Sequence, residues 1–440
     1  MSNNRFSNIH LGLSQAEAIR ILGSPIEQLD SNSDYYMAAA HLLNFPGLES
    51  ESALLKLLAS TDNSQPIKLA QRKAVEVLGL LGCQDCLPLL FDFLSSDDPY
   101  LVENTAWALK QLNCQDKATI SRLIELLYLP GQNYRIIIQA LSGLGALDSV
   151  EAIRCHLNSD NSAVQGAALA GLAILVKEDQ DLSILIEHLI LPNQMDRQSA
   201  IQDIIDSKAY NLLPQVLSAP VSPVFKMRAV RALWPINLPE IAGKSLYNCL
   251  DDLIKDEYSV VNIVHCYDEP PAIDFLIQEF FGTDFSRCYL ALKTLANRNF
   301  DDIWPILLDR WITDAFNDYG AHYFFIRLMG QAREWKVEYQ TKAIEILLEA
   351  IVNPRPQFLK SKPAAILALA EVAPQLTAQR TVQWLDPVAT LFWEARYASL
   401  LAWELLESKS LNILPLDELQ VICSTDSELY IRNRALRFSS

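Results

Sequence analysis

An apolar pair that recurs about every 30 residues constrains the fold of this chain more than any other feature. Its two members lie three residues apart, and in five of the six copies an alanine comes directly before the pair. A period of this length is typical of repeat proteins, whose units bury their apolar faces against their neighbours. The pairs are Val77/Leu80, Leu109/Leu112, Leu141/Leu144, Leu169/Leu172, Ile201/Ile204 and Val230/Leu233.

A second amphipathic segment lies between successive pairs, as in "CLPLLFDFL" (86–94) and "TISRLIELL" (119–127). Both have the apolar spacing of a helix. Polar turns such as "SSDDP" (95–99) and "NSDNS" (158–162) supply short side chains that cap helix N-termini. Two helices in each repeat, stacked in one direction, predict an all-α fold, an α-solenoid of HEAT-like repeats.

The regular period covers about the first 255 residues, and the remainder continues in helical segments with looser spacing. We therefore expect HEAT-like repeats in 1–255 and further helical repeats in 256–440, continuous with the first. The segment around Pro270 and Pro271 is the best candidate for a break or a change of superhelical pitch.

Composition excludes several classes of function. The 36 Lys and Arg against 53 Asp and Glu give a net charge of −17, which disfavours nucleic acid and therefore a HEAT-like DNA glycosylase. The start of the chain does not resemble a secretion signal, no apolar stretch reaches the roughly 18–20 residues that span a bilayer, and the eight cysteines are scattered. We expect a cytoplasmic protein without membrane insertion. The HExxH, P-loop, GxSxG and GxGxxG motifs are absent.

The segment "DDPYLVENTAWALKQL" (97–112) carries an unusual polar face. Val102, Ala106 and Leu109 share one side of the predicted helix, whereas Glu103, Asn104 and Trp107 share another. Superposing the repeats places Gln71 at the position of Glu103 and Arg72 at that of Asn104. If these helices line the inner curve, the resulting groove holds a carboxylate, an aromatic plate and four arginines. Those arginines are Arg72, Arg135, Arg228 and Arg231.

The residues alone leave two interpretations of this face. In the first, the face is solvated and Trp107 covers a junction between repeats. The function class that the residues alone favour is a non-catalytic scaffold whose concave face binds another protein. In the second, the face contacts a ligand. A second polar set, in "DYGAHYFFIR" (318–327), is also a ligand-contact candidate, with Asp318 and His322 as possible catalytic groups. Its other members are Tyr319, Tyr323 and Arg327.

Other chemically suggestive residues have ordinary explanations. Cys83-x-x-Cys86 stands alone, without a second such motif or a histidine pair, so we predict structural cysteines and no metal site. His41 has two equally supported interpretations, as an acid or ligand contact and as a residue of helix packing.

Three segments resemble one known family. "SDYYMAAAHLL" (33–43), "QRKAVEVLGLLG" (71–82) and "DDPYLVENTAWAL" (97–109) are similar to the N-terminal signature of the E/F-type phycobilin lyases. These HEAT-repeat proteins attach open-chain tetrapyrroles to phycobiliproteins in cyanobacterial photosynthesis. The total length resembles that of the long single-chain lyases of phycoerythrin α-subunits. Some relatives divide the function between two chains, and some also isomerise the bilin.

The resemblance implies a substrate, a partner and roles for the polar face. The substrate is a phycobilin, most simply phycoerythrobilin, and no tightly bound cofactor is implied. The partner is an apo-phycobiliprotein α-subunit whose cysteine is the nucleophile, with a second lyase or helper chain as a further possibility. Guanidinium groups suit the two propionates, and aromatic rings suit the conjugated system. Glu103 suits the pyrrole N–H groups and is, with Asp318 and His322, a candidate catalytic residue. The aromatic candidates are Tyr35, Tyr36 and Trp107, with Asn104 beside them.

Overall fold

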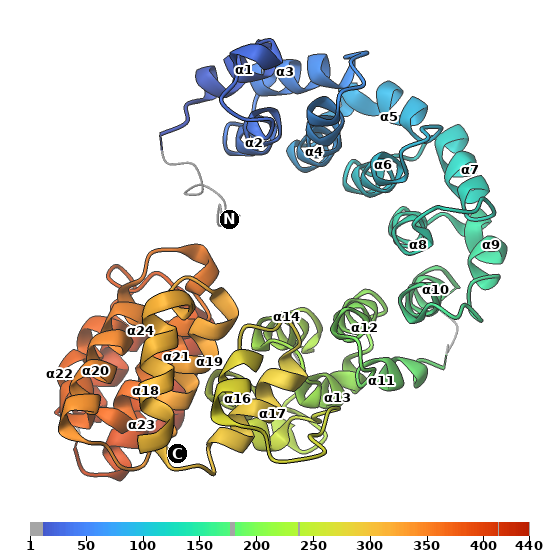
Figure 1. The fold of residues 1–440 in the computed structure, drawn as a ribbon. Helices are drawn as coiled ribbons and strands as arrows, with labels where there is room; N and C mark the ends of the chain where they lie inside the picture. The colour runs from blue at the N-terminus through green and yellow to red at the C-terminus, as the bar shows by residue number, and fades with distance from the viewer. Residues whose placement is uncertain (1–11, 177–180, 236–237, 412, 440) are drawn as a thin grey trace. The chain divides into compact units, whose positions relative to one another are not determined.

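The computed structural model describes residues 12–176, 181–235, 238–411 and 413–439, and it is almost entirely helical (Figure 1). In these residues the β-structure is one two-stranded hairpin, β1 (Glu240–Ile241) paired with β2 (Lys244–Ser245). The predicted all-α fold of HEAT-like repeats is confirmed. The segment 1–11 lies outside the described residues.

The backbone divides into two compact units, 12–184 and 185–439 within the described residues. This division comes earlier than position 255, where the sequence spacing loosens. Helix α15 (Leu246–Lys255) packs against α14 (Pro223–Leu233), α21 (Ser361–Val372) and α23 (Trp393–Ser408), so the chain on both sides of position 255 belongs to the second unit.

The first unit consists of two rows of helices with short 3-10 turns between them (Figure 1). The inner row lies on the concave side of the arc that this unit forms. The inner row comprises α2 (Asp34–His41), α4 (Gln65–Leu81), α6 (Pro99–Gln111), α8 (Tyr134–Gly143) and α10 (Ser162–Val176). The remaining helices are α1 (Gln15–Gly23), α3 (Leu48–Leu58), α5 (Leu87–Phe93), α7 (Lys117–Leu126) and α9 (Val150–Arg154). The 3-10 turns are η1 (Ile26–Gln28), η2 (Leu42–Asn44), η3 (Gln84–Cys86) and η4 (Leu147–Ser149).

The second unit continues with helices up to residue 439. Its first part comprises α11 (Ile184–His188), α12 (Gln194–Asp206), η5 (Tyr210–Leu212), α13 (Leu213–Ser218), α14, the hairpin, α15, η6 (Tyr258–Val260), α16 (Ile273–Glu279) and α17 (Phe285–Leu295). Its later part comprises α18 (Phe300–Arg310), the π-helical turn η7 (Trp311–Ala315), α19 (Tyr319–Met329), α20 (Val337–Val352), η8 (Pro356–Phe358), α21, α22 (Pro374–Leu385), α23, α24 (Leu416–Ser424), α25 (Leu429–Leu436) and η9 (Arg437–Ser439). The non-helical stretch 261–272 contains Pro270 and Pro271.

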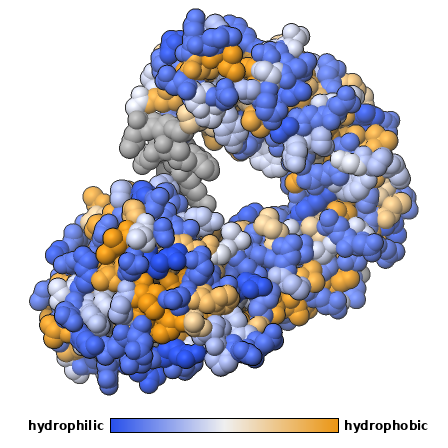
Figure 2. All heavy atoms as spheres, in the orientation of Figure 1, coloured by the Kyte–Doolittle hydropathy of each residue, from blue (hydrophilic) through white to orange (hydrophobic). Residues whose placement is uncertain are grey.

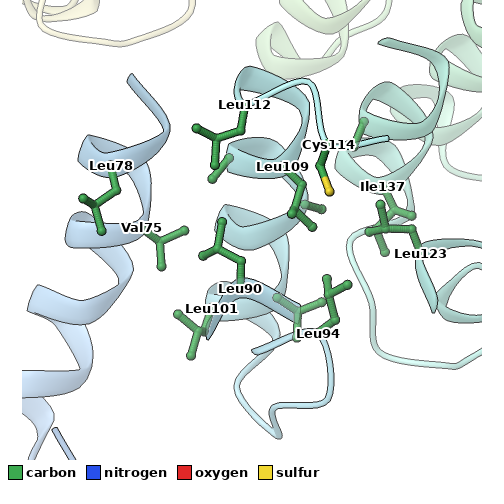
Figure 3. Packing of buried hydrophobic residues seen from close by; sticks show 14 of the residues in the cluster. Val75, Leu78, Leu90, Leu94, Leu101, Leu109, Leu112, Cys114, Leu123 and Ile137 are labelled. Atoms are coloured by element: carbon green, nitrogen blue, oxygen red, sulfur yellow. The ribbon is translucent and has the colours of Figure 1, made fainter. Parts of the chain in front are cut away.

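Most members of the recurring apolar pairs are buried in the core of the repeats, and Leu109 and Leu141 are fully buried. Leu109 lies among leucines from both rows (Figure 3). The predicted caps are confirmed, because Asp98 accepts the backbone N–H of Tyr100 at 3.1 Å and Asn161 accepts that of Ala163 at 3.0 Å. Figure 2 shows that hydrophilic residues cover most of the visible surface and that hydrophobic residues appear in scattered patches.

The register of the first copy differs from the prediction by one residue. Leu80 is 48% exposed, whereas Leu78 is fully buried, so Leu78/Leu81 is the copy of Leu109/Leu112 and the repeat spacing here is 31. The apolar run of α4 offers both pairs with equal spacing, and only packing selects between them. In this register Arg72, and not Gln71, is at the position equivalent to Glu103.

Small residues allow the inner helices to approach one another closely, as the repeated alanine predicts. A Cβ atom built on Gly79 of α4 would lie 3.0 Å from the Cβ of Ala108 in α6, and one on Gly171 of α10 would lie 2.5 Å from the Oγ of Ser142 in α8. Both distances are shorter than ordinary van der Waals contacts, so these positions exclude larger side chains unless the helices separate.

Gly79→Leu tests this close approach. We expect the substitution to lower the free energy of unfolding by about 1–3 kcal/mol, because the new side chain must push α6 away from α4. Gly23→Leu is the matched control, since a Cβ at Gly23 meets nothing within 4 Å. Thermal unfolding followed by circular dichroism measures both; equal midpoints for the two variants would contradict the packing described for α4 and α6.

Candidate functional site

Equivalent positions on three inner helices each reach the start of the next inner helix. The guanidinium of Arg72 in α4 donates to both carboxylate oxygens of Asp98, the N-cap of α6, at 2.8 and 2.9 Å. Glu103 in α6 accepts from the Nδ2 of Asn133, the N-cap of α8, at 2.6 Å. Arg135 in α8 donates to the carbonyl of Ala163 in α10 at 2.7 Å. We call these three contacts the inter-repeat ladder.

The inter-repeat ladder already uses guanidinium hydrogen-bond donors that a ligand would need. Arg72 already makes a bidentate ion pair, and its guanidinium lies 4.8 Å from the ring centre of Tyr100. The pair is about four-fifths buried, with side-chain exposures of 21% and 18%. A carboxylate ligand would have to compete with Asp98, so Arg72 holds the repeats together in this structure.

Glu103, Asn104 and Trp107 remain half-buried on the same face of α6, as the sequence predicts. Only the Oε2 atom of Glu103 has a hydrogen bond among the described residues, so Oε1 has no such partner. The amide of Asn104 donates to the carbonyl of Arg72 at 3.3 Å. The ring of Trp107 lies over Gly79, 3.5 Å from the position of an added Cβ, and thus covers the junction between α4 and α6.

A pocket of about 250 Å³ opens between α2 and α4. Tyr36 lines it and is 40% exposed, with the ammonium of Lys73 5.2 Å from its ring centre. Lys73 pairs with Glu76 on the same helix. Burial lowers the pKa of Lys73, but the hydrogen bond and charge of Glu76 outweigh it, so that the pKa is raised and the ammonium stays charged. With the corrected register, Lys73 matches Asn104 and Glu76 matches Trp107.

The neighbouring candidates of this region are structural. Tyr35 is only 4% exposed, and its hydroxyl donates to the carbonyl of Ser24 at 2.5 Å, so its ring faces the core and not the pocket. The Nε2 atom of His41 donates to the carbonyl of Leu13 at 2.6 Å, which ties α2 to the segment before α1. Cys83 and Cys86 are buried, and burial raises the pKa of Cys86 to about 12.

Arg228 and Arg231 lie on α14 in the second unit. Arg228 is exposed and donates to the Oε1 of Gln202 in α12. Arg231 is 3.6 Å from Glu428, and its guanidinium lies 5.1 and 5.4 Å from the ring centres of Trp393 and Tyr430. Both arginines thus have protein partners within their own unit.

Two candidates of the second polar set have structural roles. Asp318 is the N-cap of α19 and accepts the backbone N–H groups of Gly320 and Ala321, both at 2.8 Å. His322 is 2% exposed, lies between the rings of Trp311 and Phe358, and has its Nδ1 2.9 Å from the Oγ of Ser361. Burial lowers the pKa of His322 to about 3, so the ring is neutral near pH 7 and is a poor proton donor there.

The other members of this set surround a buried carboxylate that the sequence does not reveal. Asp256 accepts the hydroxyls of Tyr323 at 2.5 Å and Tyr289 at 2.8 Å, and Arg327 lies 3.6 Å away. Burial and the charge of Asp256 raise the pKa of both tyrosines well above 10. Tyr319 is 54% exposed, with the ammonium of Lys360 5.2 Å from its ring centre. This set therefore comes together around Asp256 and Lys360.

Metal and membrane sites find no support in the residues that the structure describes. No group of three or more His, Cys, Asp or Glu side chains there is arranged to hold a metal ion. None of the helices in the described ranges has both the length and the apolar character needed to cross a bilayer.

Comparison with known proteins gives this architecture a family. Residues 51–141 match the HEAT repeats family model. The chain is 45% identical over 370 residues to the bilin biosynthesis protein CpeY of Synechococcus sp. (strain WH8020), covering 84% of this chain and 88% of the relative. It is 33% identical over 405 residues to the uncharacterized phycocyanin operon protein Y of Pseudanabaena tenuis (strain PCC 7409), covering 90% and 93%.

A more distant relative carries an explicit enzyme name. The chain is 26% identical over 215 residues to the phycocyanobilin lyase subunit alpha of Nostoc sp. (strain PCC 7120 / SAG 25.82 / UTEX 2576), covering 45% of this chain and 77% of that subunit. The fold and these likenesses define a helical-repeat protein of bilin metabolism. The chain belongs to the E/F-type family of HEAT-repeat bilin lyases, which confirms the resemblance of its N-terminal segments.

A double-mutant cycle tests the ladder. Arg72→Leu should lower the free energy of unfolding by about 1–3 kcal/mol, because it leaves the mostly buried Asp98 without its charged partner. Asp98→Asn keeps a capping side chain while removing the charge. We expect a coupling energy of about 1 kcal/mol or more between the two substitutions in urea unfolding. Additive effects would show that the ion pair does not join the repeats.

The buried His322 should make the protein sensitive to acid. In the unfolded chain its pKa is near 6.5, whereas in the folded protein it is about 3. Between these values the unfolded state binds more protons, so stability falls as the pH falls. We expect the wild-type protein to lose roughly 3 kcal/mol relative to His322→Asn between pH 6.5 and pH 4. A constant difference in unfolding free energy would mean that the histidine is accessible to protons when folded.

Proposed function

We propose that this protein attaches phycoerythrobilin to a cysteine of a phycoerythrin α-subunit. The likeness to CpeY over most of both chains carries this proposal. The inner row of the first unit supports it, because its helices α2, α4 and α6 carry partly exposed aromatic, cationic and carboxylate side chains, namely Tyr36, Lys73, Glu103 and Trp107. The protein acts in the cytoplasm on an apo-phycobiliprotein, and the bilin is its substrate.

The proposed reaction is an addition. The sulfur of the acceptor cysteine bonds to one carbon of the exocyclic double bond of ring A, and a proton adds to the other carbon. No group leaves, and no oxidant is needed. The lyase needs no thiol of its own, which agrees with the burial of Cys83 and Cys86. Its work is to hold the bilin in one orientation and to favour protonation from one side.

Glu103 is the residue best suited to hold the pyrrole N–H groups. Its Oε1 has no hydrogen-bond partner among the described residues, and its Oε2 is fixed by Asn133. Trp107 and Tyr36 offer partly exposed rings along the same inner row, and Lys73 offers a cation beside the pocket. Arg72 and Arg135 then act by fixing the spacing of the repeats that carry these groups. The name of the Nostoc relative, lyase subunit alpha, indicates that it works with another subunit. A second chain is accordingly a further proposed partner of this protein.

Co-expression tests the function directly. The chain is produced with the enzymes that make phycoerythrobilin and with an apo-phycoerythrin α-subunit. We expect a coloured α-subunit whose chromopeptide carries the bilin mass on one cysteine, as mapped by mass spectrometry. A colourless subunit beside a folded lyase would contradict this acceptor, and attachment of an isomerised bilin would identify a lyase-isomerase.

Glu103→Gln tests the proposed ligand contact. The amide keeps an acceptor for Asn133 but loses the charge, so we expect transfer to slow by roughly tenfold or more while the fold remains intact. Glu125→Gln on α7 is the control, because Glu125 is 62% exposed on the outer row and pairs only with Arg122 among the described residues. Initial rates of chromophore absorbance report both variants. Transfer by the Glu103 variant at the rate of the control would remove Glu103 from the site.

A further inference from the structure

A second pocket lies in the other unit, far along the chain from the inner row just described. Helices α13, α14 and α15 and the hairpin enclose about 230 Å³. This volume is smaller than the roughly 300–1,000 Å³ of pockets for drug-sized ligands, so it suits a single ring or a short chain. Most of the wall is apolar, and it includes Leu213, Leu217, Trp234, Ile241, Leu253 and Val261.

One cation faces this pocket without a charged hydrogen-bond partner. Lys226 of α14 is 2% exposed and lines the pocket. Among the described residues its ammonium makes no hydrogen bond or salt bridge, and its closest recorded contact is the ring of Tyr289, with 5.8 Å to the ring centre. A buried ammonium is costly unless a counter-charge accompanies it. The cost appears in the pKa of Lys226, which burial lowers to about 8.

The carboxylates around the pocket are already engaged or lie at its edge. Asp256 opposes the charge of Lys226 from a distance, but its oxygens accept from two tyrosine hydroxyls and it also faces Arg327. Asp252 pairs with Lys244 at 2.8 Å. Glu257 lines the pocket from an exposed position. Among Lys226, Arg327 and Asp256, which lie together in the interior, positive charge therefore exceeds negative charge, although the whole chain carries −17.

Lys360 adds to this excess. Its ammonium lies 4.8, 5.2 and 5.1 Å from the ring centres of Phe285, Tyr319 and Tyr323, and the structure records no carboxylate bonded to it among the described residues. Rings stabilise a cation but do not neutralise it. In this cluster the two buried lysines and Arg327 thus share the charge of one buried carboxylate, Asp256.

We propose that this pocket binds an apolar group that carries one carboxylate, with Lys226 as the counter-ion. The apolar wall takes the ring or chain, and the carboxylate replaces the missing charge partner of the lysine. The carboxylate belongs either to a small free acid or to a substituent of a larger molecule. In the second case only that substituent enters the pocket. This site does not depend on the proposed lyase reaction.

Isothermal titration of the full-length protein with octanoate tests the proposal. We expect octanoate to bind at least about tenfold more tightly than octanol, which has the same chain without the charge. Lys226→Met keeps an apolar side chain of similar length and should weaken octanoate binding by about tenfold or more. Lys244→Met is the matched control on the same pocket, because that lysine is half-exposed and already paired; its binding should remain within about twofold of wild type.

The outcomes separate clearly. Absence of octanoate binding, equal binding of octanol, or unchanged binding by Lys226→Met would each overturn the proposal. If Lys226→Met does not fold, the octanoate and octanol comparison on the unmodified protein decides alone. Displacement of octanoate by biliverdin, an open-chain tetrapyrrole with two propionates, would assign the carboxylate to a substituent of a larger ligand, and failure to displace it would assign a small free acid. Neither result bears on transfer of the bilin, which the co-expression experiment measures separately.

Discussion

Polar side chains that reach from one helix to the N-terminus of a later one hold this structure in register. A repeat protein buries its apolar faces between neighbours, but apolar contact alone tolerates sliding. In the first unit, Arg72–Asp98 fixes α4 against α6, and Glu103–Asn133 fixes α6 against α8. In the second, Arg197 pairs with Asp284, the N-cap of α17, and Arg396 makes two bonds to Asp426, just before α25. Both arginines also donate to the carbonyls five and six residues before them.

This arrangement accounts for the two interpretations that the polar face of α6 permits. Part of the face is structural, because Arg72, Asn104 and Trp107 join α4 to α6. In another part of the face, Glu103 uses only its Oε2 for the hydrogen bond to Asn133. Under the proposed function, substrate binding and repeat packing use the same side chains, so a substitution there needs a stability measurement beside the transfer rate.

The sequence predicts what depends on local pattern and misses what depends on distant contacts. The repeat, the capping Asp98 and the buried Leu109 follow from spacing and residue type. The register of α4 does not follow, since Val77/Leu80 and Leu78/Leu81 have equal spacing, and only the burial of Leu78 and the exposure of Leu80 in the folded protein distinguish them. Tyr35 and Tyr36 are adjacent and chemically alike, yet the fold buries the first and exposes the second. Asp256 lies 67 residues from Tyr323, and a sequence such as "KDEY" gives no sign of burial.

The rungs of the inter-repeat ladder differ in chemistry, and this has a consequence for how such an array can change length. One rung joins a cation to an anionic cap, the next joins an anion to an amide, and the third joins a cation to a backbone carbonyl. Excision of a single repeat between α4 and α8 would bring Arg72 opposite Asn133, whose amide cannot neutralise it. Duplication would create the corresponding mismatch elsewhere. Mismatched charges thus disfavour the loss or gain of a repeat in this unit, and its repeats cannot be exchanged for one another.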